Sequence, residues 1–240
     1  MGETQPTPSP PVAFASGGVH PFECLSEGWK IVRPQYGLMV AVAALGILAG
    51  SFAPMGILLG PAMCGIYLCL FALMRGERIE FGLLFKGFDY FVPSLVATLV
   101  QLVPVMVILI PAYMILIASF VLSGAARASR GAPSGSDLGG VVMVAVLVML
   151  LITAVSVAVG LFFAFTYPLV VDRKLSGLDA CRVSVRAVLG NLGGMLGLVL
   201  LNVALGVVGV LLCYVGALLV MPVGLAANAV AYRRVFGEAA

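Results

Sequence analysis

Charged side chains are scarce in this sequence. Only 10% of the 240 residues are Asp, Glu, Lys or Arg, and 62% are hydrophobic, whereas an ordinary soluble domain has about 25% charged residues. The mean hydropathy of +1.18 leaves too few polar side chains to cover a water-soluble globule of this size. The shortage of charge therefore excludes a soluble protein and predicts an integral membrane protein.

Residues that build catalytic and metal sites are also in short supply. The chain has one His, and its five Cys do not have the spacing of a zinc site. Neither a phosphate-binding Gly loop nor a nucleophile elbow nor a paired carboxylate site is present. We therefore expect no catalytic residues, no metal and no cofactor. Nucleic acid is not an expected partner, because the basic residues are spread over separate loops.

The 23 charged residues avoid four long stretches of the chain, 37–74, 90–126, 138–171 and 187–232. A spanning helix needs about 20 apolar residues. The first and last stretches are therefore long enough for two helices each, and the middle two hold one each. The sequence predicts an all-α polytopic membrane protein with six transmembrane helices, at roughly 37–53, 56–75, 92–122, 140–171, 191–208 and 211–232. The third and fourth exceed the bilayer thickness, which indicates tilt, protrusion or a break.

The basic residues indicate the orientation of the chain. Eleven of the 13 Lys and Arg residues fall on one side of the membrane if both termini share that side, and only Arg127 and Arg130 fall on the other. Because basic loops are retained in the cytoplasm, we expect both termini to be cytoplasmic. The same residues favour contact with anionic lipid headgroups.

Three amphipathic segments flank the predicted spans. Residues 22–36 place apolar side chains at helical spacing, and segments 81–91 and 175–188 do the same. The third opens with Ser176 and Asp179 at capping-box spacing. Such helices suit the headgroup layer of a bilayer. The predicted interfacial anchors are Trp29, Lys30, Arg33, Arg173 and Lys174.

These segments divide the chain into units. We expect a disordered tail over residues 1–20 and a single transmembrane domain over 21–237, with units of about 21–77, 80–172 and 175–237. Residues 28–32 of the first unit align with 184–188 of the third, and Pro61 aligns with Pro222. This pattern indicates an internal duplication with parallel copies, and the alternative is chance similarity between apolar segments.

Four stretches of sequence carry a resemblance to known proteins: EGWKIVRPQYG at 27–37, GPAMCGIYL at 60–68, FGLLFKGF at 81–88 and VDRKLSGLDACRVSVRAVLGNLG at 171–193. Over residues 20–237 the chain resembles uncharacterised bacterial six-span membrane proteins. It also resembles the membrane domain fused ahead of some bacterial glycerophosphodiester phosphodiesterases. The phosphodiesterase catalytic domain has no counterpart here. The resemblance therefore implies a bacterial inner membrane and no activity.

Three amide side chains, Gln101, Asn202 and Asn228, lie within the predicted spans. They are candidates to line a polar path or a pocket for a lipid headgroup, but hydrogen bonding between helices is the commoner role of such residues. Glycine pairs at helical spacing predict close packing of helices within the chain, with homodimerisation as the alternative. These pairs are 46 with 50, 56 with 60, 190 with 194 and 193 with 197.

The leading interpretation is a non-enzymatic inner-membrane protein that acts as a scaffold or partner of another membrane system. The alternative is a small permease or lipid-handling protein with its site between the duplicated halves. A lipid-modifying enzyme is the least supported interpretation, since it would depend on the cytoplasmic carboxylates of Glu77, Glu80, Asp172 and Asp179.

Overall fold

The computed structural model describes residues 14–52, 57–130, 135–211 and 215–237, and these residues form helices and no strand. Its elements are α1 (Pro21–Val32), η1 (Arg33–Gln35), α2 (Tyr36–Phe52), α3 (Leu59–Met74), α4 (Phe81–Phe85), η3 (Lys86–Tyr90), α5 (Phe91–Arg130), α6 (Gly135–Phe162), α7 (Thr166–Asp172), α8 (Gly177–Gly190), α9 (Leu192–Leu211) and α10 (Val215–Phe236). The predicted all-α polytopic class is confirmed.

The long helices agree with the six predicted spans. Five helical stretches are long and apolar enough to cross a membrane: Pro21–Gly50, Phe81–Gly124, Gly139–Asp172, Leu192–Leu211 and Gly216–Phe236. The remaining predicted span, at 56–75, corresponds to α3, an apolar helix of 16 residues. The first stretch contains both α1 and α2, which are joined by the short η1 helix with Pro34 at its second position.

The third and fourth spans differ in continuity. α5 continues as one helix through Pro104 and Pro111, whereas the fourth span ends at Phe162 and resumes as α7. Ser184 of α8 stabilises this break, since its hydroxyl donates to the Phe162 carbonyl at 2.9 Å and accepts from the Phe165 N–H at 3.2 Å. A hydroxyl from another helix thus satisfies backbone groups that an unbroken helix would pair internally.

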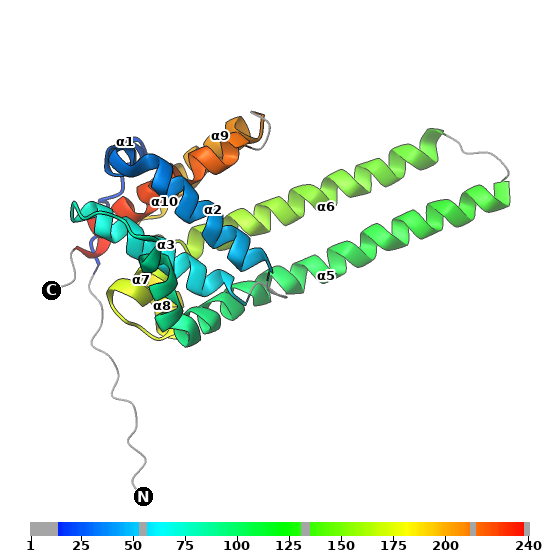
Figure 1. The fold of residues 1–240 in the computed structure, drawn as a ribbon. Helices are drawn as coiled ribbons and strands as arrows, with labels where there is room; N and C mark the ends of the chain where they lie inside the picture. The colour runs from blue at the N-terminus through cyan, green and yellow to red at the C-terminus, as the bar shows by residue number, and fades with distance from the viewer. Residues whose placement is uncertain (1–13, 53–56, 131–134, 212–214, 238–240) are drawn as a thin grey trace, which may run out of the picture.

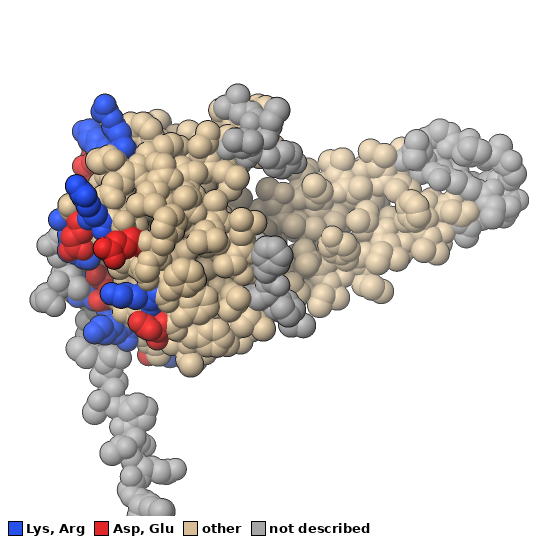
Figure 2. Space-filling model, viewed as in Figure 1, with Lys and Arg blue, Asp and Glu red and all other residues tan. Residues whose placement is uncertain are grey.

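Charged side chains gather at one end of the molecule, and the rest of the described surface in this view carries none (Figure 2). Both described chain ends lie there: the Ala15 N–H donates to the Val235 carbonyl at 2.8 Å, and the Phe14 and Phe236 rings are 6.4 Å apart. The two described ends of the chain therefore lie together at the charged end, which is consistent with the distribution of basic residues. Which side faces the cytoplasm stays a prediction.

The N-terminal boundary of the ordered domain differs from the sequence prediction, which assigned residues 1–20 to a disordered tail. Residues 1–13 lie outside the described residues, but 14–20 pack against the protein. Asn191 accepts from the Gly17 N–H at 2.7 Å and donates to the Ala15 carbonyl at 2.9 Å, and Val19 is buried. The amide of Asn191, between α8 and α9, holds this segment in place.

The interfacial helices and the spans pack in a ring of three units. α1 packs on α10 of the last unit, α4 and η3 pack on α3 of the first, and α8 packs on α5 and α7 of the second. Each contact is close at a glycine. A Cβ atom would come within 2.7 Å of the α10 backbone at Gly28, within 2.3 Å of the α3 backbone at Gly87 and within 2.3 Å of the α5 backbone at Gly177.

The ends of the three units share a backbone conformation. The last helix of each unit is followed by a residue with positive φ: Gly76 (77°), Lys174 (52°) and Gly237 (71°). Lys174 is the one residue other than Gly with this conformation in the described part of the chain, and a side chain there is uncommon. The recurrence of a left-handed residue at the same place supports the repeated plan.

Equivalent positions of the outer units meet at the centre of the molecule. The alignment of Pro61 with Pro222 also places Tyr67 opposite Asn228 and Phe71 opposite Tyr232. The Asn228 amide lies 3.4 Å from the Tyr67 hydroxyl, and the Phe71 and Tyr232 rings are 5.8 Å apart. Contacts between equivalent residues are expected near a pseudo-symmetry axis. Aromatic side chains, including those of Tyr67, Phe71 and Tyr232, fill the space around this axis.

The predicted glycine pairs are used within the chain. Gly46 and Gly50 of α2 face Ile66 and Leu59 of α3, and Gly60 faces Ser94 and Thr98 of α5. Gly190, Gly194 and Gly197 face Phe14, Val19 and Pro21, whereas Gly193 has open space and Gly56 lies outside the described residues. The pairs thus serve mainly to bring segments of one chain together.

Candidate functional site

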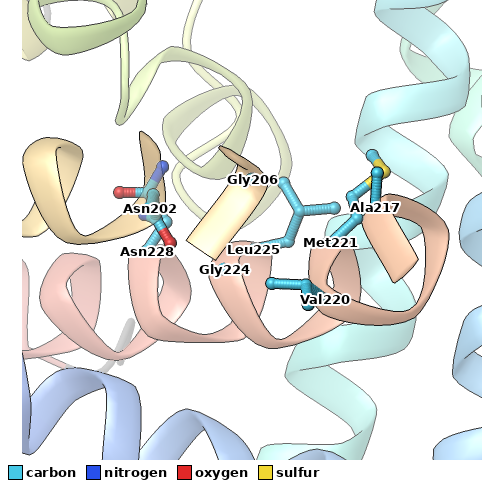
Figure 3. Close-up of a pocket in the computed structure, with 8 residues that line it drawn as sticks. All are labelled: Asn202, Gly206, Ala217, Val220, Met221, Gly224, Leu225 and Asn228. Atoms are coloured by element: carbon cyan, nitrogen blue, oxygen red, sulfur yellow. The ribbon is translucent and has the colours of Figure 1, made fainter. Parts of the chain in front are cut away.

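Two of the three candidate amides line one cavity. Asn202 of α9 and Asn228 of α10 are among the residues around a hollow of about 310 Å³ between these helices (Figure 3). The other lining residues are Gly206, Ala217, Val220, Met221, Gly224 and Leu225. The cavity lies inside the third unit, so the structure does not place this pair between duplicated halves.

Gly224 makes room for this site. At Gly224 a Cβ atom would come within 2.7 Å of the Asn202 side-chain oxygen, so the position of the Asn202 amide depends on the missing side chain. Asn228 reaches the opposite way, toward the Tyr67 hydroxyl at 3.4 Å and the Ala164 carbonyl at 3.5 Å. These long hydrogen bonds connect α10 to α3 and to the break before α7.

Gln101 lies apart from this pair. It is on α5 beside the Tyr167 hydroxyl, and it is not among the residues that line the cavity. Within the described residues its Nε2 is buried and has no hydrogen bond of good geometry. The Tyr167 hydroxyl also meets Thr98 at 3.1 Å, and Thr98 donates to the Ser94 carbonyl at 2.8 Å. Gln101 therefore belongs to a polar network between α5 and α7.

Three of the four carboxylates considered for catalysis, those of Asp172, Asp179 and Glu77, are engaged in structural contacts. Asp172 accepts a hydrogen bond from Tyr232 at 2.7 Å and lies 3.6 Å from both Arg173 and Arg233. Asp179 takes part in the predicted capping interaction with Ser176, which is confirmed by an N–H to Oγ distance of 3.2 Å. Glu77 forms a double hydrogen bond with Arg75, at 2.7 and 3.0 Å, and this guanidinium lowers the pKa of the Glu77 carboxyl. Glu80 is the N-cap residue of α4.

The predicted interfacial anchors fall into two groups. Trp29, Lys30, Arg33 and Lys174 are exposed at the charged end. Arg173 instead donates to the Phe236 carbonyl at 2.8 Å and is half-buried. Arg173 thus joins the end of α7 to the end of α10.

A groove beneath α1 escaped the sequence analysis. It has a volume of about 370 Å³ and lies between α1 and the spans α9 and α10. Tyr36 closes one side, because its hydroxyl donates to the Leu219 carbonyl at 2.6 Å. Pro222 lacks an N–H and leaves the neighbouring Leu218 carbonyl without its helical donor. A Tyr in one segment and a Pro inside a later helix were the sequence signals for this contact. The hydrogen bond between these segments joins residues 183 positions apart, so the sequence alone did not pair them.

Comparison of the chain with protein-family models, curated proteins and solved structures found no match. The fold and these sites define the chain as an all-α polytopic membrane protein. The cavity with Asn202 and Asn228 lies between α9 and α10, the groove beneath α1 is lined by α1, Tyr36, α9 and α10, and charged residues gather at one end.

Proposed function

We propose that this chain is a non-enzymatic protein of the bacterial inner membrane, with both termini in the cytoplasm, and that it acts as a partner of another membrane protein. The α5–α6 hairpin is its docking arm. The observation that carries the proposal is that this apolar hairpin extends far beyond the other helices, on the side away from the charged end (Figure 1).

The hydrocarbon core of a bilayer is too thin to cover the whole length of the hairpin. The charge-free run of residues 90–126 contains 37 residues, which is about 55 Å of helix at ~1.5 Å per residue. The hydrocarbon core is about 30 Å thick. A helix of this length would need a tilt of about 57° to fit, and spans are tilted by roughly 0–40°. By contrast, the 20 residues of α9 and the 22 residues of α10 suit one bilayer.

The hairpin is also the least covered part of the protein. Its two helices have only 6% of their most apolar windows buried, against 44% for α10. Large apolar side chains point outward on both helices, including Ile117, Phe120 and Leu147. Apolar surface that leaves the hydrocarbon is costly in water, at about 25 cal/mol per Å². A helical surface of another membrane protein supplies the missing apolar cover.

Photo-cross-linking in intact cells tests this proposal. The photo-reactive residue benzoylphenylalanine replaces Phe120 or Leu147 on the hairpin, and Leu48 of α2 is the matched control because its exposed fraction of 56% is close to the 59% of Leu147. We expect a discrete protein adduct from both hairpin positions and none from Leu48. An adduct of twice the chain mass would identify the partner as a second copy. Equal, lipid-only labelling at all three positions would contradict the proposal.

A shortened hairpin separates docking from folding. Deleting residues 112–118 and 143–149 removes about two turns from each helix and keeps the helical phase. We expect this variant to keep the thermal stability of the bundle and to lose the discrete adduct from a photo-reactive residue at position 120. Retention of the adduct would show that the extra length is not what the partner recognises.

A second candidate function, lipid handling, is favoured by the cavity that holds Asn202 and Asn228. A polar path between the three packed units is not favoured, because aromatic side chains fill the space where the outer units meet. If the cavity binds a headgroup, replacing both residues by Leu should abolish complementation of a deletion strain while the protein remains stable. If the amides only join helices, the same change should cost about 0.6 to 2 kcal/mol of stability and leave complementation intact. Gln101→Leu is the control outside the cavity.

A further inference from the structure

The groove beneath α1 continues into a second hollow at the charged end. The groove is lined by side chains that are almost all apolar, from α1, α9 and α10, and by Tyr36. The second hollow, of about 300 Å³, is lined by Phe22, Glu23, Ser26, Glu27 and Lys30. Phe22 and Ser26 belong to both. An apolar site thus opens directly onto a charged one, which is the division of chemistry within a phospholipid.

The walls of the groove are fixed by contacts within the protein. Gly28 brings α1 against the α10 backbone, so the neighbouring face of α1 with Phe22 and Trp29 borders the groove. The rings of Trp29 and Tyr36 pack edge to face at 5.3 Å. Tyr36 is held in turn by its hydrogen bond to the Leu219 carbonyl. The volumes of both hollows are in the usual range for ligand sites, about 300–1,000 Å³.

The charges at the rim select among headgroups. Arg234 of α10 contacts Glu23 at 2.9 Å and Glu27 at 2.7 Å, so two carboxylates share one guanidinium and leave a net negative charge. Both carboxylates remain about half exposed or more, at 63% and 48%. Lys30 lines the same hollow. The site therefore offers acceptors for a cation and a separate positive charge for a phosphate.

We propose that these two hollows bind one phospholipid with a primary amine headgroup, such as phosphatidylethanolamine. An acyl chain lies in the groove beneath α1, the ammonium group donates to the carboxylates of Glu23 and Glu27, and the phosphate lies near Lys30. An anionic lipid would bring its charge against two carboxylates, and a quaternary ammonium has no N–H to donate. This site lies on α1 and α10 and is independent of docking through the hairpin.

Trp29 provides a direct measurement, because it is the only Trp in the chain and it lines the groove. The full chain is reconstituted in bilayers that contain a small mole fraction of lipid brominated on its acyl chains. We expect brominated phosphatidylethanolamine to quench Trp29 with a relative binding constant about two- to five-fold above that of phosphatidylglycerol or phosphatidylcholine, the range typical of exposed charge pairs. Equal quenching by the three lipids, or preference for phosphatidylglycerol, would overturn the proposal.

Charge variants test the headgroup contacts. The double variant Glu23→Gln and Glu27→Gln should lose the preference for phosphatidylethanolamine, whereas Glu80→Gln, a matched change on α4, should keep it. Because the double variant also breaks the pairs with Arg234, Lys30→Gln provides a second test that leaves those pairs in place, and we expect about a two-fold loss of binding. An unchanged preference in both the double variant and Lys30→Gln would contradict the site.

Two Val→Phe substitutions, one inside the groove and one outside it, test whether an acyl chain occupies the groove. Val223→Phe adds a ring inside the groove, and Val207→Phe adds one to an exposed position of α9 outside it. We expect the first change to reduce quenching of Trp29 by brominated phosphatidylethanolamine at low mole fraction, and the second to leave it unchanged. Equal quenching in the two variants would show that no chain occupies the groove.

Discussion

Individual glycine residues determine how closely the interfacial helices approach the spans. Gly28, Gly87 and Gly177 each lie where a Cβ atom would meet the backbone of a helix from another unit. Backbone atoms cannot turn aside as a flexible side chain can, so the whole helix would have to move. In a membrane, where apolar lipid gives helices little hydrophobic drive to associate, such close contact is a main source of attraction.

Gly28→Ala should therefore weaken the docking of α1. The new methyl carbon would lie 2.7 Å from the Ala227 nitrogen, and we expect a loss of about 1 to 3 kcal/mol, as for overpacked cores. Gly37→Ala is the matched control, because a Cβ atom there meets nothing within 4 Å, and helix propensity favours Ala by up to about 1 kcal/mol. Unfolding in mild detergent, followed by circular dichroism, checks both. Equal stability of the two variants would refute the close contact.

The residue types of the site were predictable, but their grouping was not. Asn202, Asn228 and Gln101 could be selected because polar side chains are rare in apolar spans. Their sequence positions do not say which helices pack together. The structure places Asn202 with Asn228 because α9 and α10 form one hairpin, and it places Gln101 beside Tyr167 because α5 meets α7. The sequence places Tyr36 at the end of the amphipathic segment 22–36, and its hydrogen bond to Leu219 depends on the same tertiary packing.

Among the helices, hydrophobic runs predicted the spans well because absence of charge is a strong local signal. The predicted helix at 191–208 is observed at Leu192–Leu211, and that at 37–53 at Tyr36–Phe52. The break between Phe162 and Thr166 depends on Ser184, which comes from a helix later in the sequence. The prediction named a break as one alternative for the long fourth span but could not place it.

The ion pairs between α1 and α10 should make α1 docking sensitive to acid. The hydrogen bond from Arg234, aided by the nearby charge of His20, holds the pKa of Glu23 below its usual value of 4.5. A carboxyl with a lowered pKa in the folded state stabilises it above its unfolded pKa, and this contribution is lost as the pH falls through the folded one. We expect Trp29 emission to stay constant between about pH 5 and pH 8 and to change only below 4.5.

Arg234→Gln removes the cause of this shift. The pKa of Glu23 should then return toward its usual value, so its titration no longer favours the docked helix, and the change in Trp29 emission at low pH should be smaller. High salt should act in the same direction on the unmodified protein, because these pairs are largely exposed and are screened. An emission change of the same size in both proteins would assign it to another group.

For the molecule as a whole, the grouping of charge at one end gives a testable topology. The basic residues before α2, between α3 and α5, between α7 and α9 and after Tyr232 all belong to that end, whereas α5 ends and α6 begins far from it. We expect reporter fusions after residues 80, 176 and 240 to report the cytoplasm and a fusion after 131 to report the periplasm. A periplasmic signal at 240 would contradict the shared location of the two chain ends.

The contact between α1 and α10 can form only after the last helix has been synthesised. α1 is translated first, but the α10 residues that receive Gly28 and pair with Glu23 are about 200 positions later. At about 5–20 residues per second, a ribosome needs roughly 10–40 s to reach them. During that time we expect the apolar face with Phe22 and Trp29 to keep α1 at the membrane surface. The nascent chain therefore holds its first helix on the bilayer until the last span has been inserted, and only then does the helix acquire its protein neighbour.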